Sequence, residues 1–255
     1  MDYKPFFSII LATYNRAYCI DRAIESVLNQ SFQDLELIIV DDGSTDNTEE
    51  EVKKYLKDKR IKYIKLEKNS GVNVARNRAI KESKGEYLCI LDSDNELKSD
   101  ILNKYKFYIE KEKFPYMKFI CQNQNEKFIV KNPNFYGYIN YKDFLVEKLK
   151  GEYQTLVKAD LLKSNLFFED IQGGEGIVWK LIAKNTKKIL FIPEVAIIYD
   201  DSNEDRLSIK NYNRLYKVFK KDLEVLGIDY LKYSPFMFFK NFSKFIIYGV
   251  LKNFK

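Results

Sequence analysis

Histidine is absent from the 255 residues of this chain, so the commonest general base and metal ligand of proteins is not available to it. Any acid–base or metal chemistry must therefore use carboxylates. The three cysteines, Cys19, Cys89 and Cys121, sit in apolar surroundings and form no CxxC pair. This pattern argues against a disulfide framework and against a zinc site, and it predicts a reducing, cytoplasmic location.

Flexible linkers and long apolar runs are also missing. Only 5 prolines and 10 glycines occur, while 45% of the residues are apolar, so we expect one compact body rather than a disordered chain. No run reaches the roughly 18 uncharged apolar residues of a membrane span. The first seven residues also lack the apolar region of a signal peptide. We therefore expect a protein that is neither secreted nor membrane-spanning.

The charge balance is only mildly basic, with 43 basic against 37 acidic residues and a formal charge of +6. This bias suits an anionic ligand or an anionic membrane face. A concentrated basic face and a recognised nucleic-acid-binding motif are both missing, so no nucleic-acid partner is expected.

The first 96 residues alternate short apolar runs with helical patterns. The runs at 7–12, 35–40, 61–66 and 87–91 predict strands, because each is rich in apolar residues and stops at a small or acidic one. The segments between them predict helices, one with a capping box formed by Thr48 and Glu51 and one that opens at Gly71. This βαβ organisation predicts an α/β fold whose parallel sheet holds ligands at the carboxyl ends of its strands.

The second half has a mixed pattern. Helices are expected over 100–111, 141–149, 176–184 and 208–226, and strands over 117–121, 128–131, 189–191 and 195–199. The last segment, 228–255, combines Phe, Tyr and Ile with lysines. Two interpretations of it stand equal: a helix that docks on the domain, or a segment that lies in the plane of a membrane surface.

Polar and charged residues follow each predicted strand. Thr13-Tyr14-Asn15 closes the first, and Asp42 follows the second beside a glycine turn, where a carboxylate can accept hydrogen bonds from a base or a ribose. Arg76 and Arg78 lie near the start of the third helix, where free N–H groups also favour anions such as a diphosphate.

Asp92-Ser93-Asp94 after the fourth strand is the sharpest chemical signal. Two alternating carboxylates at the end of a buried strand have no role in a core and are costly if unpaired. Mg²⁺ and Mn²⁺ prefer such hard oxygen ligands and bridge them to substrate phosphates. A divalent cation at Asp92 and Asp94 is therefore predicted.

These four segments, Phe7 to Asn15, Val40 to Asp46, Asn69 to Asn77 and Leu91 to Asp94, resemble the inverting family 2 glycosyltransferases with the GT-A fold. The resemblance is strong over residues 6–96 and weak beyond. It implies a Rossmann-like three-layer α/β fold with a mostly parallel central sheet and a C-terminal helical extension. The domain would span 1–227, with a nucleotide-binding half at 1–96 and an acceptor-binding half at 97–227.

The resemblance also implies roles for individual residues. Thr13 and Asp42 would contact the base and the ribose, with Tyr14, Asn15 and Ser93 beside them, and Arg76 rather than Arg78 would lie at the nucleotide. In the family a late segment commonly carries a histidine that joins the metal. Here Asp200 occupies the similar place, and Arg206 follows it as a candidate for the diphosphate or the acceptor.

An inverting transferase also needs a carboxylate that takes the proton of the acceptor hydroxyl. The family usually places it in an acidic pair before a helix with an aromatic residue. The matching segment here is Gly173-Gly174-Glu175-Gly176 before Trp179, so glycine replaces the second acid. Glu175 is the first candidate for the base, and Asp170 and Glu169 are its rivals.

The resemblance thus predicts transfer of a sugar from a nucleotide-diphosphate sugar, by default a UDP-sugar, to a saccharide or lipid-linked saccharide during surface polysaccharide synthesis. A divalent cation, Mn²⁺ or Mg²⁺, would be the cofactor, and the protein would be cytoplasmic or peripheral at the inner face of the membrane. The alternative is a non-catalytic protein that binds sugar nucleotides, and Gly176 is the residue that favours it.

Overall fold

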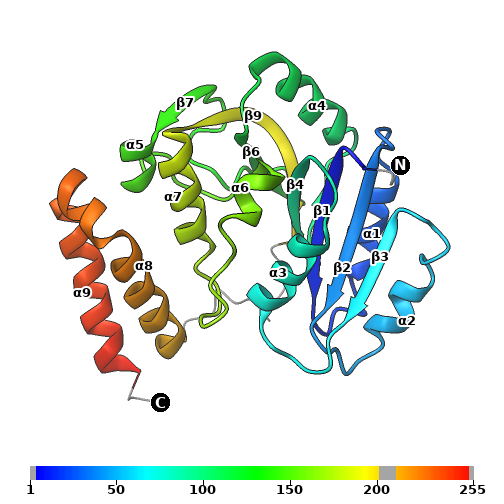
Figure 1. Cartoon of the computed structure of the whole chain (residues 1–255), viewed down its shortest axis with the longest axis horizontal. Helices are drawn as coiled ribbons and strands as arrows, with labels where there is room; N and C mark the ends of the chain where they lie inside the picture. The colour runs from blue at the N-terminus through cyan, green and yellow to red at the C-terminus, as the bar shows by residue number, and fades with distance from the viewer. Residues whose placement is uncertain (1–3, 201–210, 253–255) are drawn as a thin grey trace.

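A computed structural model describes residues 4–200 and 211–252 of the chain (Figure 1). The N-terminal half contains the expected alternation of strands and helices. Its elements are β1 (Phe7–Thr13), α1 (Ile20–Leu28), β2 (Leu35–Asp41), α2 (Thr48–Lys53), β3 (Ile61–Lys65), α3 (Val72–Glu82) and β4 (Tyr87–Asp92). The four strands are parallel and lie in the order β3-β2-β1-β4, which confirms the prediction for this half.

The second half extends the same sheet. Its elements are β5 (Glu96–Leu97), α4 (Ile101–Glu112), β6 (Tyr116–Asn123), β7 (Gly137–Asn140), α5 (Tyr141–Leu145), β8 (Tyr153–Lys158), α6 (Ala159–Lys163), α7 (Glu175–Thr186), β9 (Lys188–Tyr199), α8 (Tyr212–Tyr233) and α9 (Pro235–Leu251). The order continues from β4 through β8, β6 and β9 to β5, and β7 pairs with the first residues of β9, Lys188–Phe191.

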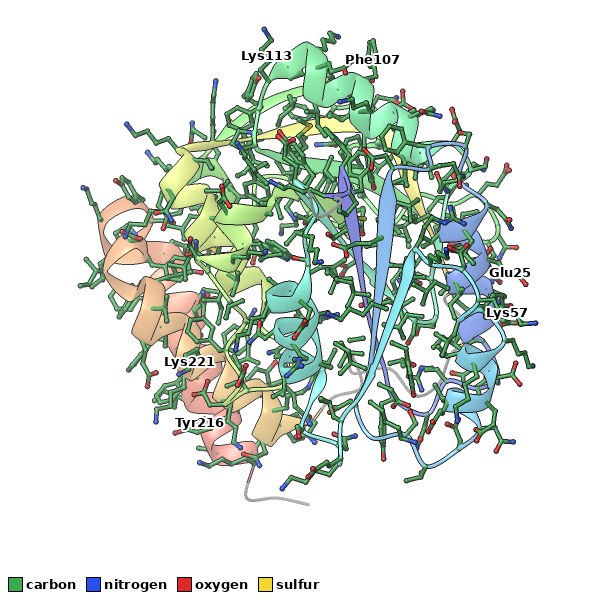
Figure 2. The ribbon with its side chains drawn as sticks, turned by 45° about the vertical axis from the view of Figure 1, so that its right-hand side comes forward. Glu25, Lys57, Phe107, Lys113, Tyr216 and Lys221 are labelled. Atoms are coloured by element: carbon green, nitrogen blue, oxygen red, sulfur yellow. The ribbon has the colours of Figure 1, made fainter. Side chains whose placement is uncertain are left out.

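Helices cover both faces of the sheet, which gives the three layers expected (Figure 1). Alternate residues of β1 point to opposite faces, as a strand requires. Phe7, Ile9 and Leu11 pack in one apolar cluster with α1, α2 and α4. Ile10 packs in the other with α3, α5, α6 and α7. Side chains fill the space between these layers (Figure 2), and the carboxyl ends of β1, β2 and β4 meet at one edge.

The last two helices form a hairpin beside α7. Leu226, Tyr230 and Met237 pack into the second cluster. Helices α8 and α9 therefore dock on the domain, which was one of the two interpretations of the C-terminal segment. The boundary expected at residue 228 falls inside α8. Among the described helices, none combines the length and the apolar character needed to cross a membrane.

Several predicted elements differ from the structure. Helix α5 ends at Leu145 rather than 149, and residues 189–199 form one continuous strand. Residues 128–131 make only isolated bridges. The capping box at Thr48 is wrong: both the backbone N–H and the hydroxyl of Thr48 donate to the carboxylate of Asp46, and Asn47 is the N-cap. The Asp46 carboxylate, two residues before Thr48, accepts from both of these groups, so Glu51 is not needed as the acceptor of the Thr48 N–H.

Candidate active site

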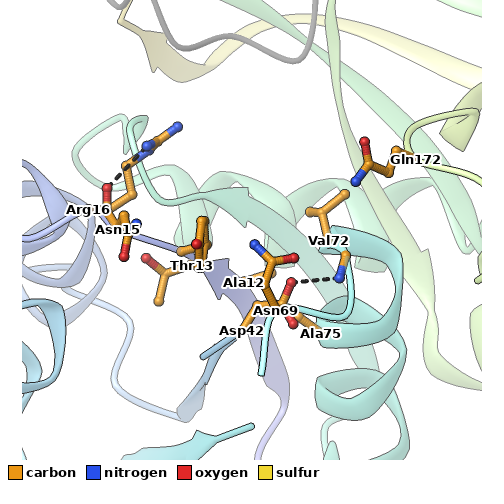
Figure 3. Close-up of a pocket in the computed structure, with 11 residues that line it drawn as sticks. Ala12, Thr13, Asn15, Arg16, Asp42, Asn69, Val72, Ala75 and Gln172 are labelled. Carbon is orange, nitrogen blue, oxygen red and sulfur yellow. Dashed lines mark hydrogen bonds between the residues drawn. The ribbon is translucent and has the colours of Figure 1, made fainter. Parts of the chain in front are cut away.

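A hollow of about 430 Å³ opens at the carboxyl ends of β1 and β2, bounded on the other side by the start of α3 (Figure 3). Thr13, Tyr14, Asn15 and Asp42 line it. The structure therefore brings together four of the five residues that the sequence analysis placed at or beside the base and the ribose. The fifth, Ser93, is not among the described residues that line this hollow.

Thr13, at the end of β1, has a hydrogen-bonded backbone carbonyl and a hydroxyl that makes no hydrogen bond to the described residues. Its carbonyl accepts a hydrogen bond from the backbone N–H of Asp42 at 2.8 Å, which holds the two strand ends together. Its buried Oγ1 has no hydrogen-bond partner among the described residues. Because buried polar atoms are nearly always paired, an unpaired hydroxyl in the wall of a hollow suits a ligand.

Asp42 organises the loop before α3. Its two carboxylate oxygens accept the backbone N–H groups of Ser70 and Gly71, each at 2.7 Å. Burial raises the pKa of Asp42, while these two N–H groups oppose the rise. Gly71 has a φ of +103°, a left-handed conformation that glycine adopts without strain. Each oxygen keeps a second lone pair for a ligand.

Asn15 fixes the turn that follows β1. Its φ of +51° is tolerated by asparagine better than by most residues, and its backbone N–H donates to Ser44 Oγ at 2.9 Å. Its side-chain oxygen accepts the N–H of Thr45 at 2.9 Å. Tyr14 stands partly exposed beside it. These hydrogen bonds fix the conformation of the turn, and Tyr14 and Asn15 both line the hollow.

Arg76 on α3 joins two carboxylates from distant parts of the chain. Its Nη2 donates to Asp92 at 2.6 Å, and its Nη1 donates to Glu175 at the start of α7. The guanidinium also lies over the ring of Phe167. Burial alone would lower the pKa of Arg76, but the two carboxylates outweigh it and the pKa is raised. Arg76 is therefore a fixed positive charge beside the acidic motif.

The three residues of the acidic motif have different surroundings. The Asp92 side chain is half exposed, Ser93 is buried, and Asp94 is partly buried. Burial, and after it the charge of Asp94, raises the pKa of the neighbouring Cys19 thiol. Asp92 and Asp94 thus provide hard oxygen donors at the end of β4, which is the ligand chemistry that Mg²⁺ and Mn²⁺ prefer.

Asp200, the third predicted ligand, lies at the end of β9 next to this motif. Its backbone N–H donates to Asn95 Oδ1 at 3.1 Å, and its carboxylate accepts Nη2 of Arg22 at 2.8 Å. Within residues 4–200 and 211–252, no three acidic or cysteine side chains form a ready-made metal cluster. The donor set fits an ion that takes its remaining ligands from a bound diphosphate.

Each of the three candidate bases has a partner. Glu169 accepts a hydrogen bond from the side-chain amide of Asn77 at 2.9 Å. Glu175 accepts from Nη1 of Arg76. Asp170 is exposed and pairs at 2.6 Å with Lys221 of α8, a residue labelled in Figure 2. This contact lowers the pKa of Asp170. Asp170 lines a separate hollow of about 260 Å³ with Arg214 and Lys217, so the structure does not bring it to Arg76. Arg206 lies outside the described residues.

Comparisons with known proteins now decide the family. Residues 8–164 match the model described as glycosyl transferase family 2. A Campylobacter jejuni protein named GalNAc(5)-diNAcBac-PP-undecaprenol beta-1,3-glucosyltransferase is 32% identical over 88% of this chain and 74% of its own length. The chain belongs to glycosyl transferase family 2.

Further comparisons agree with this family 2 membership. A Bacillus subtilis protein named putative teichuronic acid biosynthesis glycosyltransferase TuaG is 45% identical over 40% of this chain and 41% of its own length. The S. aureus TarS structure with UDP-GlcNAc has a TM-score of 0.75 at 21% identity, over 87% of this chain and 66% of that one. A Pyrobaculum calidifontis mannosyltransferase with GDP-Man and Mn²⁺ has a TM-score of 0.64 at 19% identity, over 98% and 74%. The GT-A fold is confirmed.

This family 2 glycosyltransferase also uses residues that the sequence did not single out. Asn73 donates to three backbone carbonyls, those of Phe168, Ile171 and Gly173. Asn77 binds the backbone of Phe167 on both its N–H and its carbonyl. These amides hold the segment before α7 against α3. The only sequence feature that could have indicated a role for these two asparagines is their position in the same motif as Arg76.

Proposed function

We propose that this glycosyltransferase is inverting and metal-dependent, and that it transfers a sugar from a UDP-sugar to a saccharide or lipid-linked saccharide in surface polysaccharide synthesis of the capsule, exopolysaccharide or lipopolysaccharide type. One observation carries the proposal. The hollow at Thr13 and Asp42 and the Asp92-Ser93-Asp94 motif lie at one sheet edge, and Arg76 ties that motif to α7.

The base and ribose of the donor are assigned to the hollow. The free hydroxyl of Thr13 can donate to or accept from a uracil ring or a ribose, and the remaining lone pairs of Asp42 can accept from either. Tyr14 and Asn15 form the wall. UDP is supported by the TarS complex with UDP-GlcNAc. Because the Pyrobaculum mannosyltransferase binds GDP-Man, GDP-mannose is the alternative donor to test beside the UDP-sugars.

The diphosphate is assigned to the acidic motif. Asp92 and Asp94 would hold a divalent ion, with Asp200 as a third oxygen donor and Ser93 beside the sugar nucleotide. When bound, the ion neutralises negative charge on the diphosphate as it leaves. Arg76 holds Asp92 in position and adds a fixed positive charge nearby, and Arg206 is proposed to reach the diphosphate or the acceptor.

The acceptor class is supported by the relatives. One is named for a glucosyltransferase acting on an undecaprenol-linked glycan, and another for teichuronic acid biosynthesis. A lipid-linked acceptor would require the site to work near a membrane surface, which makes the C-terminal hairpin relevant.

Helix α9 exposes an apolar stripe. Five of its large exposed apolar residues recur every three or four positions and so share one face of the helix: Phe236, Phe239, Phe242, Ile246 and Val250. Ile247 is exposed beside them. Residues 230–255 contain five lysines and no acidic residue. This combination of apolar stripe and uniform positive charge fits an anionic lipid surface on which α9 lies in plane. We assign the stripe to that surface, so the protein would be peripheral at the cytoplasmic face.

The test of this function is release of UDP from UDP-glucose, UDP-GlcNAc and UDP-GalNAc in the presence of Mn²⁺, with GDP-mannose in parallel. We expect one UDP-sugar to be turned over and EDTA to stop it. Gly176 favours the non-catalytic alternative, for which the same donors would bind without any release of nucleotide. Binding without turnover under every condition would therefore establish that alternative.

A further inference from the structure

Gly176 stands where the family usually has the second acidic residue, so this chain has no carboxylate at that position. Gly176 lies in the first turn of α7, and a Cβ built on it would meet no atom within 4 Å. The space that a second acidic side chain would fill is therefore open. Glu175 is bound by Arg76 and Asp170 by Lys221, and Glu169 accepts a hydrogen bond from Asn77. None of the three predicted bases is therefore free to accept a proton without first losing a partner.

This open space belongs to a hollow of about 530 Å³ between β8 and α7. Glu175 and Gly176 line its α7 side together with Trp179. Glu152 and Tyr153 line the side of β8, and Lys118 lies at its buried end. Glu175 joins this hollow, through Arg76, to Asp92.

Sheet register brings Glu152 close to the acidic motif. The side chain of Gln154 donates to the backbone carbonyl of Ile90 at 2.7 Å, so the beginning of β8 lies alongside the end of β4. Glu152 stands two residues earlier, on the side of Asp92. Gly151 fixes the backbone before it: its φ is +133°, and a Cβ there would lie 2.5 Å from Val130 Cα. The position of Glu152 is thus determined by packing.

The carboxylate of Glu152 is free and faces solvent in the hollow. It makes no ion pair and no hydrogen bond with any other residue in the described part of the chain. Partial burial of the carboxylate raises the pKa of Glu152, the positive charge of Lys118 opposes the rise, and the negative charges of Asp92 and Glu175 add to it. An unpaired carboxylate with a raised pKa is a better proton acceptor than one bound to a cation.

We propose that Glu152 is the general base of the transfer and that the acceptor saccharide occupies the hollow between β8 and α7. The inference rests on the proposed function. The acceptor O–H bond breaks and its proton passes to the Glu152 carboxylate, while the oxygen forms a bond to the anomeric carbon. The bond from that carbon to the diphosphate breaks, and its electron pair leaves with the nucleoside diphosphate.

The walls of the hollow suit a sugar ring. Trp179, Phe144 and Tyr153 contribute aromatic surface, against which the apolar face of a sugar can pack. The Lys118 ammonium lies 5.4 Å from the centre of the Trp179 ring and donates to Thr155 at 2.8 Å. It places a positive charge near the position where an acceptor oxygen would become negative. Gly176 provides the room for this acceptor.

The test compares the wild type with Glu152→Gln, with Glu152→Gln combined with Gly176→Asp, and with the control Glu126→Gln on an exposed turn outside the hollow. UDP release is measured from the UDP-sugars named above with Mn²⁺, using p-nitrophenyl glycosides and water as acceptor probes. Donor binding and the melting temperature are measured in parallel.

We expect Glu152→Gln to lower kcat about 100-fold or more, the usual contribution of a general base, with donor binding and melting unchanged. Gly176→Asp should restore at least tenfold of the loss, because the open space accepts the new carboxylate. The control should match the wild type. A kcat for Glu152→Gln within threefold of the wild type overturns the inference alone. A wild type that neither binds nor turns over any donor defeats the proposed function, and the role of Glu152 with it.

Discussion

Arg76 Nη2 lies 2.6 Å from a carboxylate oxygen of Asp92, so a helix that begins beside the nucleotide hollow holds the acidic motif at the end of β4. The other terminal nitrogen binds Glu175, 99 residues further along the chain. One buried guanidinium thus connects the donor side of the site with the helix that borders the proposed acceptor hollow.

Arg76→Met should therefore loosen both connections. We expect the free energy of unfolding to fall by about 1–3 kcal/mol, because hydrogen bonds to charged groups are lost, and turnover to fall more than donor affinity. Urea denaturation measures the free energy of unfolding, and steady-state kinetics measure turnover and donor affinity. Arg78→Met is the matched control, since Arg78 is half exposed and pairs with Glu82 on its own helix. Its effect should stay below about 0.5 kcal/mol. Equal effects of the two substitutions would contradict the role of Arg76.

Thr13→Val tests the assignment of the nucleotide hollow. Valine has nearly the same shape, and the hydroxyl that it removes is buried and unpaired among the described residues. The substitution should leave stability unchanged or raise it slightly, because removing an unpaired buried polar atom relieves a cost. Calorimetric affinity for UDP should fall about five- to twentyfold. Unchanged affinity for UDP would show that the hydroxyl does not contact the nucleotide.

The sequence was sufficient for the first four strands because each is an apolar run that stops at a polar residue. It was insufficient for β8, whose buried Gln154 and Thr155 interrupt the apolar pattern. Tertiary contacts satisfy them: Gln154 binds the backbone of Ile90, and Thr155 binds Lys118. Since β8 was missed, Glu152 was missed with it.

The candidate site shows the same division. The residues around Thr13, Asp42 and Asp92 follow strand ends, and the topology of a parallel sheet is enough to place such residues together at one edge. The contact of Arg76 with Glu175 depends on how α7 packs on α3, and no local pattern encodes that distance. The pairing of Asp170 with Lys221 depends on α8 in the same way.

Lys118 should make stability depend on pH. Burial lowers the pKa of Lys118 from 10.5 to about 8, so between these values the unfolded chain binds more protons and stability from this group rises with pH. Lys118→Met removes this dependence. The free energy of unfolding of the variant minus that of the wild type should therefore fall by roughly 2 kcal/mol between pH 7 and pH 9.5. Urea denaturation of both proteins across this range measures the difference, and a constant difference would contradict the prediction.

The apolar stripe of α9 should govern binding to lipid. Phe236→Ser combined with Phe239→Ser should lower co-sedimentation with vesicles of phosphatidylglycerol at least tenfold, because each buried Phe contributes about 1.5–3 kcal/mol. Phe107→Ser is the control, since Phe107 is similarly exposed but lies on α4 (Figure 2). Vesicles of phosphatidylcholine should bind weakly in every case. Loss of a protein dimer in place of lipid binding would assign the stripe to a second copy.

The most direct measurement of the central claim is the melting temperature of wild type and Asp94→Asn with UDP-sugars, each with Mn²⁺ and with EDTA. The account predicts that a donor at about 100 times its Kd raises the wild-type melting temperature by roughly 5–10 °C with Mn²⁺, and that EDTA or Asp94→Asn removes most of this rise. An equal rise with EDTA, or an unchanged rise in Asp94→Asn, would contradict a divalent ion held between the acidic motif and the diphosphate.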